Sequence, residues 1–277
     1  MVDSPQKSTE SRRARGRPRD WHDKTGQNTI KSLDRALEML DRLSEIGGAT
    51  LSELAEATEQ SPATVYRVLI TMEGRGMVEF NPATQVWNVG ARAFLIGSWF
   101  LRRTNLVERA RPILRQLMEA TGETANLGME RGGQVLFLSQ VETHASIRAF
   151  FPPGTLSPMH SSGIGKALLA QVGAERVRDI VRDHGLDRFT AHTLTDLPSL
   201  ERDLAATRTR GYSIDAEERN EGMKCVASPV FDIHGEAVAG LSVSGPASRI
   251  PDDQIARLGG EVARAATELS RAIGADR

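Results

Sequence analysis

The chain has 277 residues and a net charge of −1, and 39% of its residues are hydrophobic and 26% charged. This length exceeds one typical hydrophobic core, so two globular domains are expected, and the composition excludes a disordered or fibrous protein. The one cysteine, Cys225, excludes an intrachain disulfide framework and a cysteine-based zinc site, and no apolar run is long enough to span a membrane. With an N-terminus too polar for a secretory signal, these features predict a cytoplasmic protein without a metal or cofactor.

The first 28 residues are polar and contain a cluster of positive charge. Five arginines fall between Arg12 and Arg19, and no hydrophobic period accompanies them, so residues 1–28 are expected to form a flexible basic tail. The run Arg-Gly-Arg-Pro-Arg from Arg15 resembles the core of an AT-hook, whose arginines enter a narrow minor groove. Arg15 and Arg17 are therefore candidate DNA contacts. A solvated tail that only raises general DNA affinity is the alternative, and the sequence leaves both open.

Three short helices are predicted after the tail. Apolar residues recur at helical spacing from Ile30 until Gly47-Gly48, which predicts the first helix. Thr50 with Glu53 forms a capping box that starts a second helix over 51–58. Ser61 as N-cap, followed by proline at the first helical position, starts a third over 62–73.

A hairpin is predicted next, with strands over 77–80 and 85–89 and a turn between them. Helix, turn, helix and hairpin in this order predict a winged helix-turn-helix DNA-binding domain over residues 29–90. A surface helix in an unrelated helical bundle is the alternative.

The third helix is the predicted DNA reader. Hydroxyl groups can bond a base edge or phosphate, a methyl group can contact thymine, and arginine can grip guanine or phosphate. On this basis the candidate contacts are Ser61, Ala63, Thr64 and Arg67. Val65, Val68 and Leu69 are expected to pack into the core from the other face.

The rest of the chain predicts a linking helix and a larger domain. The apolar residues of 91–104 indicate a buried linking helix, and the domain over 105–277 mixes strands with helices, which is typical of an α+β sensor fold. Strands are expected over 135–138, 212–215, 225–231 and 237–243. Helices are expected over 164–172, 174–183, 198–210 and 252–273, and a loop over 151–154.

Several motifs in order resemble the IclR family of bacterial transcriptional regulators. They are Ser32–Leu37, Thr64–Leu69, Pro158–Ala170, Arg210–Asp215 and Cys225–Phe231, and the resemblance covers residues 29–273. It implies a GAF-like effector-binding domain, dimers formed through the DNA-binding half and often tetramers through the sensor half. It also implies a ligand-responsive regulator of a metabolic operon rather than an enzyme.

The resemblance also implies an effector site. Gly163 and Ile164 would donate backbone N–H groups to a ligand carboxylate, and Asp215, Cys225, Ser242 and Ser244 would line the rest of the pocket. Amides at a glycine-rich helix start suit an anion, and serines spaced two apart share one face of a strand. A small 2-oxo acid such as glyoxylate or pyruvate fits this pocket. Ile164 is bulkier than its counterpart in many relatives, which favours a small ligand over an aromatic acid.

Other interpretations of these residues remain open. Cys225 could be a buried apolar residue, Asp215 could cap a turn, and Lys166 is expected at a helix surface or in a structural role. A P-loop is rejected because His160 stands at the first glycine position and alanine follows Lys166.

Two rival functions are also considered. One is an enzyme with Cys225 as nucleophile and His160, His192 or His234 as base, although no known catalytic motif is present. The other is a DNA-binding architectural protein whose second domain only oligomerises.

Overall fold

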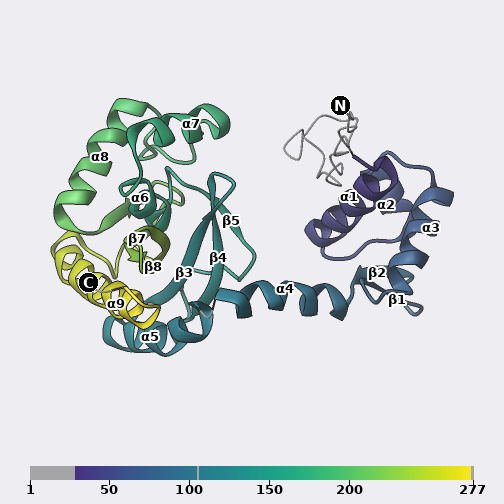
Figure 1. Cartoon of the computed structure of the whole chain (residues 1–277), viewed down its shortest axis with the longest axis horizontal. Coiled ribbons are helices and arrows are strands. Elements are labelled where there is room, and N and C mark those ends of the chain that lie inside the picture. The colour runs from purple at the N-terminus through teal and green to yellow at the C-terminus, as the bar shows by residue number, and fades with distance from the viewer. Residues whose placement is uncertain (1–28, 105, 276–277) are drawn as a thin grey trace, which may run out of the picture. The chain divides into compact units, whose positions relative to one another are not determined.

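The structure is a computed structural model that describes residues 29–104 and 106–275. The chain divides into two compact units after Gly97, and each is described by itself (Figure 1). The basic tail, with its candidate contacts Arg15 and Arg17, lies outside the described residues.

The first unit contains the three predicted helices and the predicted hairpin. Their bounds are α1 (Lys31–Ile46), α2 (Leu51–Ala57), α3 (Pro62–Glu73), β1 (Val78–Asn81) and β2 (Val86–Val89). Gly47 ends α1 in the left-handed conformation, at φ 77°. The capping box of Thr50 and Glu53 starts α2, and the Ser61 hydroxyl caps α3, as predicted.

Side chains from all five elements form one core. Met39, Leu43, Leu54, Val65 and Leu69 are buried there, so the predicted inward face of α3 is confirmed for Val65 and Leu69, while Val68 is only partly buried. The Trp87 ring packs on Phe80 with ring centroids 4.8 Å apart. Ala49 exchanges two backbone hydrogen bonds with Trp87, which fastens the hairpin to the segment between α1 and α2.

Helix α4 (Ala91–Thr104) occupies the residues of the predicted linking helix. The expectation that it is buried is wrong for the part whose side chains are described, because Phe94 is 75% exposed and Ile96 is 53% exposed. A single copy of the chain therefore leaves much of the apolar surface of this helix in contact with solvent.

The second unit is built on one antiparallel sheet of six strands, as the α+β prediction requires. The strand order is β5-β4-β3-β8-β7-β6. Their bounds are β3 (Thr124–Arg131), β4 (Gln134–Val141), β5 (Leu156–Pro158), β6 (Ser213–Ala216), β7 (Met223–Phe231) and β8 (Ala237–Pro246).

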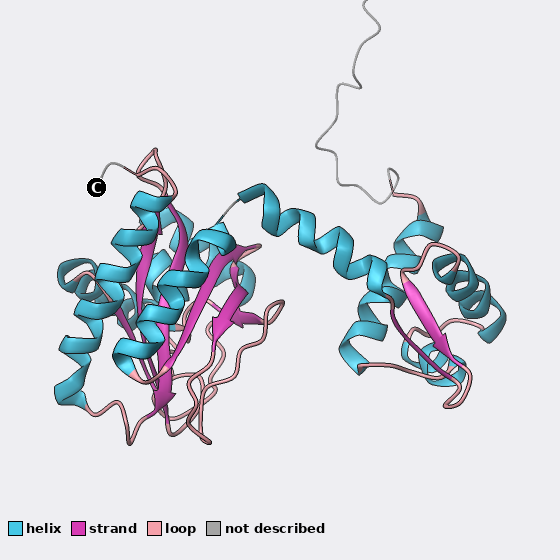
Figure 2. Ribbon diagram, turned by 90° about the horizontal axis from the view of Figure 1, so that it is seen from below, coloured by secondary structure: helices cyan, strands magenta, loops and turns pink. Residues whose placement is uncertain are grey.

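Helices cover both faces of this sheet (Figure 2). On one face, α5 (Leu106–Thr121) and α9 (Asp252–Ala272) pack on an apolar core. On the other lie α6 (Gly163–Leu169), α7 (Ala174–His184) and α8 (Leu197–Arg210). Neighbouring residues of β7 serve different cores, Val226 the first and Ala227 the second, because successive strand side chains point to opposite faces.

Candidate functional site

The start of α3 presents the predicted DNA-contacting residues. The Ser61 hydroxyl accepts the Thr64 N–H at 3.2 Å and lies 2.8 Å from the Thr64 hydroxyl. Ala63 and Arg67 are exposed, and the Arg67 guanidinium has no hydrogen-bond or ion-pair partner in the described part of the chain. Arg67 also lines a groove of about 490 Å³ between α1 and α3. The four residues thus share one accessible helix end.

Sequence reasoning missed two neighbours on this surface. Tyr66 is 50% exposed and Ile70 is 43% exposed. They lie three and seven positions after Ala63, so they share its helix face. That spacing is the signal that could have found them.

A second candidate site is a small cavity between the N-terminus of α6 and the sheet. It measures about 20 Å³, and five of the six predicted effector residues line it together: Gly163, Ile164, Asp215, Cys225 and Ser242. The other lining residues are Phe137, Phe151, Ser157, Ser161, Ser162 and Arg219. A space of this size holds about one water molecule, so the cavity must widen to admit any organic ligand.

The sixth predicted residue, Ser244, does not line the cavity. The side-chain amide of Asn126 donates to both Ser242 and Ser244, at 3.3 Å each, and the Asn126 oxygen accepts from Gln140 at 3.1 Å. Asn126 is fully buried. It was missed by sequence reasoning and holds the two serine hydroxyls in place on one strand face.

Two predicted anion donors lie at the start of α6. The N–H groups of Gly163 and Ile164 donate to no described residue, whereas the next one, from Gly165, donates to the Ser162 hydroxyl at 3.4 Å. A side chain at Gly163 is excluded, because its Cβ would lie 2.6 Å from the Cys225 Sγ. Glycine here lets the helix start approach the floor of the cavity.

The bulk of Ile164 is accommodated by glycines in the sheet beneath it. A Cβ at Gly240 would lie 2.8 Å from the Ile164 Cγ2, and one at Gly128 would lie 3.3 Å from its Cδ1. Because its side chain fills space that these glycines leave, the bulk of Ile164 is a weaker restriction on ligand size than its sequence position suggests.

The Asp215 carboxyl both lines the cavity and caps a turn. One of its oxygens accepts the Glu218 N–H at 2.8 Å. Burial, with a smaller contribution from the charge of Glu218, raises the pKa of Asp215 to about 7. The group is therefore largely neutral below pH 7 and can then act as a hydrogen-bond donor.

The thiol of Cys225 is poorly suited to nucleophilic attack. Burial and the neighbouring Asp215 charge raise its pKa to about 11, so the thiolate is scarce near pH 7. His160, one of the considered bases, has its Nε2 3.0 Å from the carbonyl oxygen of Asp187, and burial lowers its pKa. The geometry gives the enzyme interpretation no support.

Lys166 is buried, so its expected position at the helix surface is wrong and its structural role is confirmed. Its Nζ lies 2.5 Å from a Glu218 carboxylate oxygen and 3.2 Å from an Asp203 oxygen. A buried ammonium needs such partners to offset its desolvation. The ion pair ties α6 to the turn after Asp215, and thereby fixes two walls of the cavity.

Ser161 and Arg219 are further cavity residues that sequence reasoning missed. The Ser161 Oγ and the Arg219 Nη1 are both buried without a hydrogen-bond partner in the described residues. The Arg219 guanidinium lies 3.9 Å from the centroid of the Phe189 ring. The sequence could have pointed to Arg219 only through its position in the loop between β6 and β7, close to Asp215.

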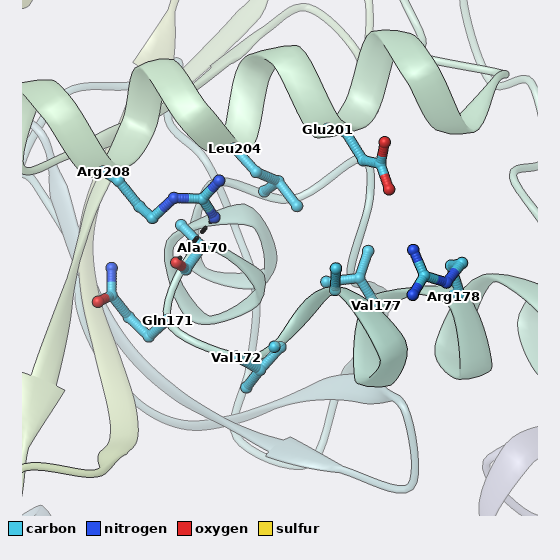
Figure 3. A pocket seen from close by; sticks show the side chains of 10 residues that line it. Ala170, Gln171, Val172, Val177, Arg178, Glu201, Leu204 and Arg208 are labelled. Atoms are coloured by element: carbon cyan, nitrogen blue, oxygen red, sulfur yellow. Dashed lines mark hydrogen bonds between the residues drawn. The ribbon is translucent and has the colours of Figure 1, made fainter.

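A larger surface cleft lies among α6, α7 and α8 (Figure 3). It measures about 730 Å³, but its charged groups Arg178, Glu201 and Arg208 are exposed. Arg208 already donates to the Ala170 carbonyl at 3.1 Å. No buried polar atom without a partner lines this cleft in the described residues, so the small cavity is the better candidate.

The described residues contain no group of three or more His, Cys, Asp or Glu side chains placed to hold a metal ion. No helix among them combines the length and apolar character needed to cross a membrane.

Known proteins resemble the chain over most of its length. Residues 32–82 match the IclR helix-turn-helix domain, and residues 99–271 match the family described as bacterial transcriptional regulator IclR C-terminal. The HTH-type transcriptional regulator BhcR of Paracoccus denitrificans is 52% identical over 261 residues, which cover 93% of this chain and 94% of that protein.

Two further relatives agree with these matches. The acetate operon repressor of Salmonella typhimurium is 43% identical over 256 residues, with coverage of 91% and 93%. The crystal structure of the Thermotoga maritima IclR has a TM-score of 0.74 and 31% identity, and the match covers 89% of this chain and 100% of that one. The curated relatives named here are transcription regulators, which are not enzymes.

Proposed function

Because the chain belongs to the IclR family of bacterial transcriptional regulators, with a helix-turn-helix domain and an effector-binding domain, we propose that a small carboxylate controls its binding to an operator. The best candidate effector is glyoxylate or a similar 2-oxo acid. The protein acts in the cytoplasm on a metabolic operon. The name of one relative, the acetate operon repressor, supports genes of small-acid metabolism.

The observation that carries the effector proposal is the convergence of hydrogen-bond donors on one cavity. The free N–H groups of Gly163 and Ile164 meet the Ser242 hydroxyl there, and the Asp215 carboxyl joins them as a donor when neutral. A 2-oxo acid offers only acceptors, namely its carboxylate and carbonyl oxygens, and so complements such a site. Cys225 lines the site, and Ser244 supports it by accepting a hydrogen bond from Asn126.

The operator is read by the exposed end of α3. Ala63 and Arg67 reach base edges, while Ser61 and Thr64 contact phosphate or base. Arg15 and Arg17 of the tail add minor-groove contacts.

Two copies of the chain bind together. Helix α1 leaves Leu33 and Leu37 more than half exposed, and α4 leaves Phe94 and Ile96 more than half exposed. Exposed apolar side chains on these two helices support a homodimer formed through the DNA-binding half. Tetramers would use the effector-binding half.

The proposed domains are a tail over residues 1–28, the DNA-binding domain over 29–90, the linking helix over 91–104 and the effector-binding domain over 105–277. The effector binds one arrangement of the effector-binding domains more tightly, and the linking helix transmits that arrangement to the two reader helices. The coupling free energy between effector and operator binding then comes from the difference in effector affinity between the two states.

The test is an electrophoretic mobility shift on the DNA upstream of the protein's own gene, with and without millimolar glyoxylate, pyruvate and an aromatic acid. A specific shift that glyoxylate changes supports the proposal, and Ser242→Ala is expected to weaken that response without affecting the shift itself. A response to the aromatic acid alone would replace the ligand class. A specific shift that no acid alters would favour an architectural DNA-binding protein.

A further inference from the structure

We infer that Arg219 and Ser161 bind the ionised carboxylate of the effector, so that the cavity selects acids over uncharged molecules of the same shape. This inference deepens the proposed function and rests on it. It assigns the positive charge of the site to a side chain that neither the motifs nor the residues implied by the family resemblance include.

Arg219 brings a positive charge to the cavity. Arg219 lines the cavity, and its Nη1 is buried without a hydrogen-bond partner in the described residues. The neighbouring carboxylate of Glu218 is already paired with Lys166 at 2.5 Å. Arg219 itself forms no ion pair with a described carboxylate. A buried guanidinium donor left unpaired is costly, and a ligand carboxylate would supply its missing acceptor.

Ser161 supports a carboxylate site independently of Arg219. This residue is fully buried, lines the same cavity, and has a hydroxyl without a partner in the described residues. Buried hydroxyls are normally hydrogen-bonded. Ser161 precedes Gly163 by two residues, so its hydroxyl belongs to the same loop as the free N–H groups.

The donors around the cavity are placed to serve both oxygens of a ligand carboxylate. A carboxylate has two oxygens with about four lone-pair sites. The N–H groups of Gly163 and Ile164 with the Ser161 hydroxyl can serve one oxygen from the α6 side, and Arg219 can serve the other from the loop between β6 and β7. An ionised group neutralises the partly buried guanidinium, whereas an uncharged amide or aldehyde leaves its charge unpaired.

Arg219 has one other contact that could explain its position. Its guanidinium stacks on Phe189, with 3.9 Å from Cζ to the ring centroid. If stacking were its only role, replacing Arg219 would affect charged and uncharged ligands equally. The comparison between two ligands of one shape therefore separates the two roles.

The experiment is isothermal titration calorimetry of the full-length protein with pyruvate and with uncharged pyruvamide. The wild type is expected to prefer the acid. Arg219→Gln should weaken pyruvate binding by about 10- to 100-fold and leave pyruvamide binding nearly unchanged, because only the acid loses a charge-assisted hydrogen bond. Ser161→Ala should weaken acid binding by roughly three- to tenfold.

Two controls keep the result specific. Arg208→Gln removes the same charge from the exposed cleft among α6, α7 and α8, and should change neither affinity. Arg219→Lys retains the charge without the planar fork, so it should recover part of the preference for the acid, and it also answers the question if Arg219→Gln fails to fold.

The outcomes separate the two proposals. An equal loss for both ligands, or an unchanged acid preference in Arg219→Gln, would overturn the role of Arg219. A wild-type protein that binds neither pyruvate nor glyoxylate overturns the proposed function, and this inference with it.

Discussion

The two units present their functional side chains in opposite ways. On α3, Ala63 and Arg67 lie on an accessible surface formed by a well-packed core beneath it. In the second unit, Asp215 and Ser242 are buried around a space of about 20 Å³. The first surface can dock on DNA as it stands, whereas the second must change shape to accept a ligand. Ligand binding in this protein is thus inseparable from a conformational change, which is what a regulator requires.

The largest predicted effect tests the buried scaffold of the closed site. Lys166→Met should destabilise the second unit by about 3–5 kcal/mol, because Glu218 would be left as an uncompensated buried charge. Urea denaturation of the full chain measures this loss. The double variant Lys166→Met with Glu218→Gln should recover much of the stability. An unchanged midpoint in the single variant would show that the pair is not a support of the cavity.

The next effect tests the open surface. Arg67→Ala should weaken operator binding by about 1–3 kcal/mol if the guanidinium contacts a base edge. Fluorescence anisotropy with specific and unrelated DNA measures the change, and Arg42→Ala on α1, whose arginine pairs with Glu45, is the control. An equal loss on both DNAs would identify Arg67 as a phosphate contact. Effector affinity should not change.

A smaller effect is expected from pH at the closed site. Because the pKa of Asp215 is raised to about 7, the carboxyl is neutral at pH 6 and ionised at pH 8, where it repels an anionic ligand. Effector affinity should therefore fall by about tenfold between these pH values, as calorimetry in matched buffers would measure. Asp215→Asn should remove this dependence. A stronger affinity at pH 8 would contradict the assignment.

The same shift has a consequence for stability. The folded state favours the neutral form of Asp215, so its contribution is fully present below about pH 4 and is lost as the pH rises to about 7. Glu218, whose pKa burial also raises, contributes in the same direction. Ionisation of these two carboxyl groups is expected to destabilise only the second unit.

The smallest effect tests how far the reader helix depends on its own cap. Ser61→Ala removes the hydroxyl that accepts the Thr64 N–H, and should destabilise the first unit by about 1 kcal/mol. Thermal denaturation measures this, with Ser44→Ala at an exposed position of α1 as control. A loss of operator affinity much larger than the loss of stability would show that the hydroxyl also contacts DNA.

The first unit could be predicted almost completely because its signals are local. The capping box of Thr50 and Glu53 and the cap at Ser61 act within four residues of chain, and both form as expected. The burial of α4 was the exception, since the helical pattern shows that a face is apolar without showing what covers it.

The second unit was harder to predict because its site is assembled from distant segments. Strand β3 was missed although Ala125, Leu127 and Met129 alternate along it, because the asparagine, glycine and glutamate between them are residues that strands disfavour. The family resemblance implied six residues of the effector site, and five of them line the cavity. Arg219 and Asn126 could not be identified from the sequence. Only the strand order shows that the loop between β6 and β7 and strand β3 contribute to the same site.

The packing of Trp87 on Phe80 also supplies a built-in spectroscopic reporter. The three tryptophans of the chain are Trp21, Trp87 and Trp99, so no indole lies in the sequence after residue 99. No residue that lines the cavity is a tryptophan, and Trp87 belongs to the other compact unit. A change in the emission of Trp87 on adding an acid would therefore report a change in the DNA-binding unit, with no dye attached to the protein.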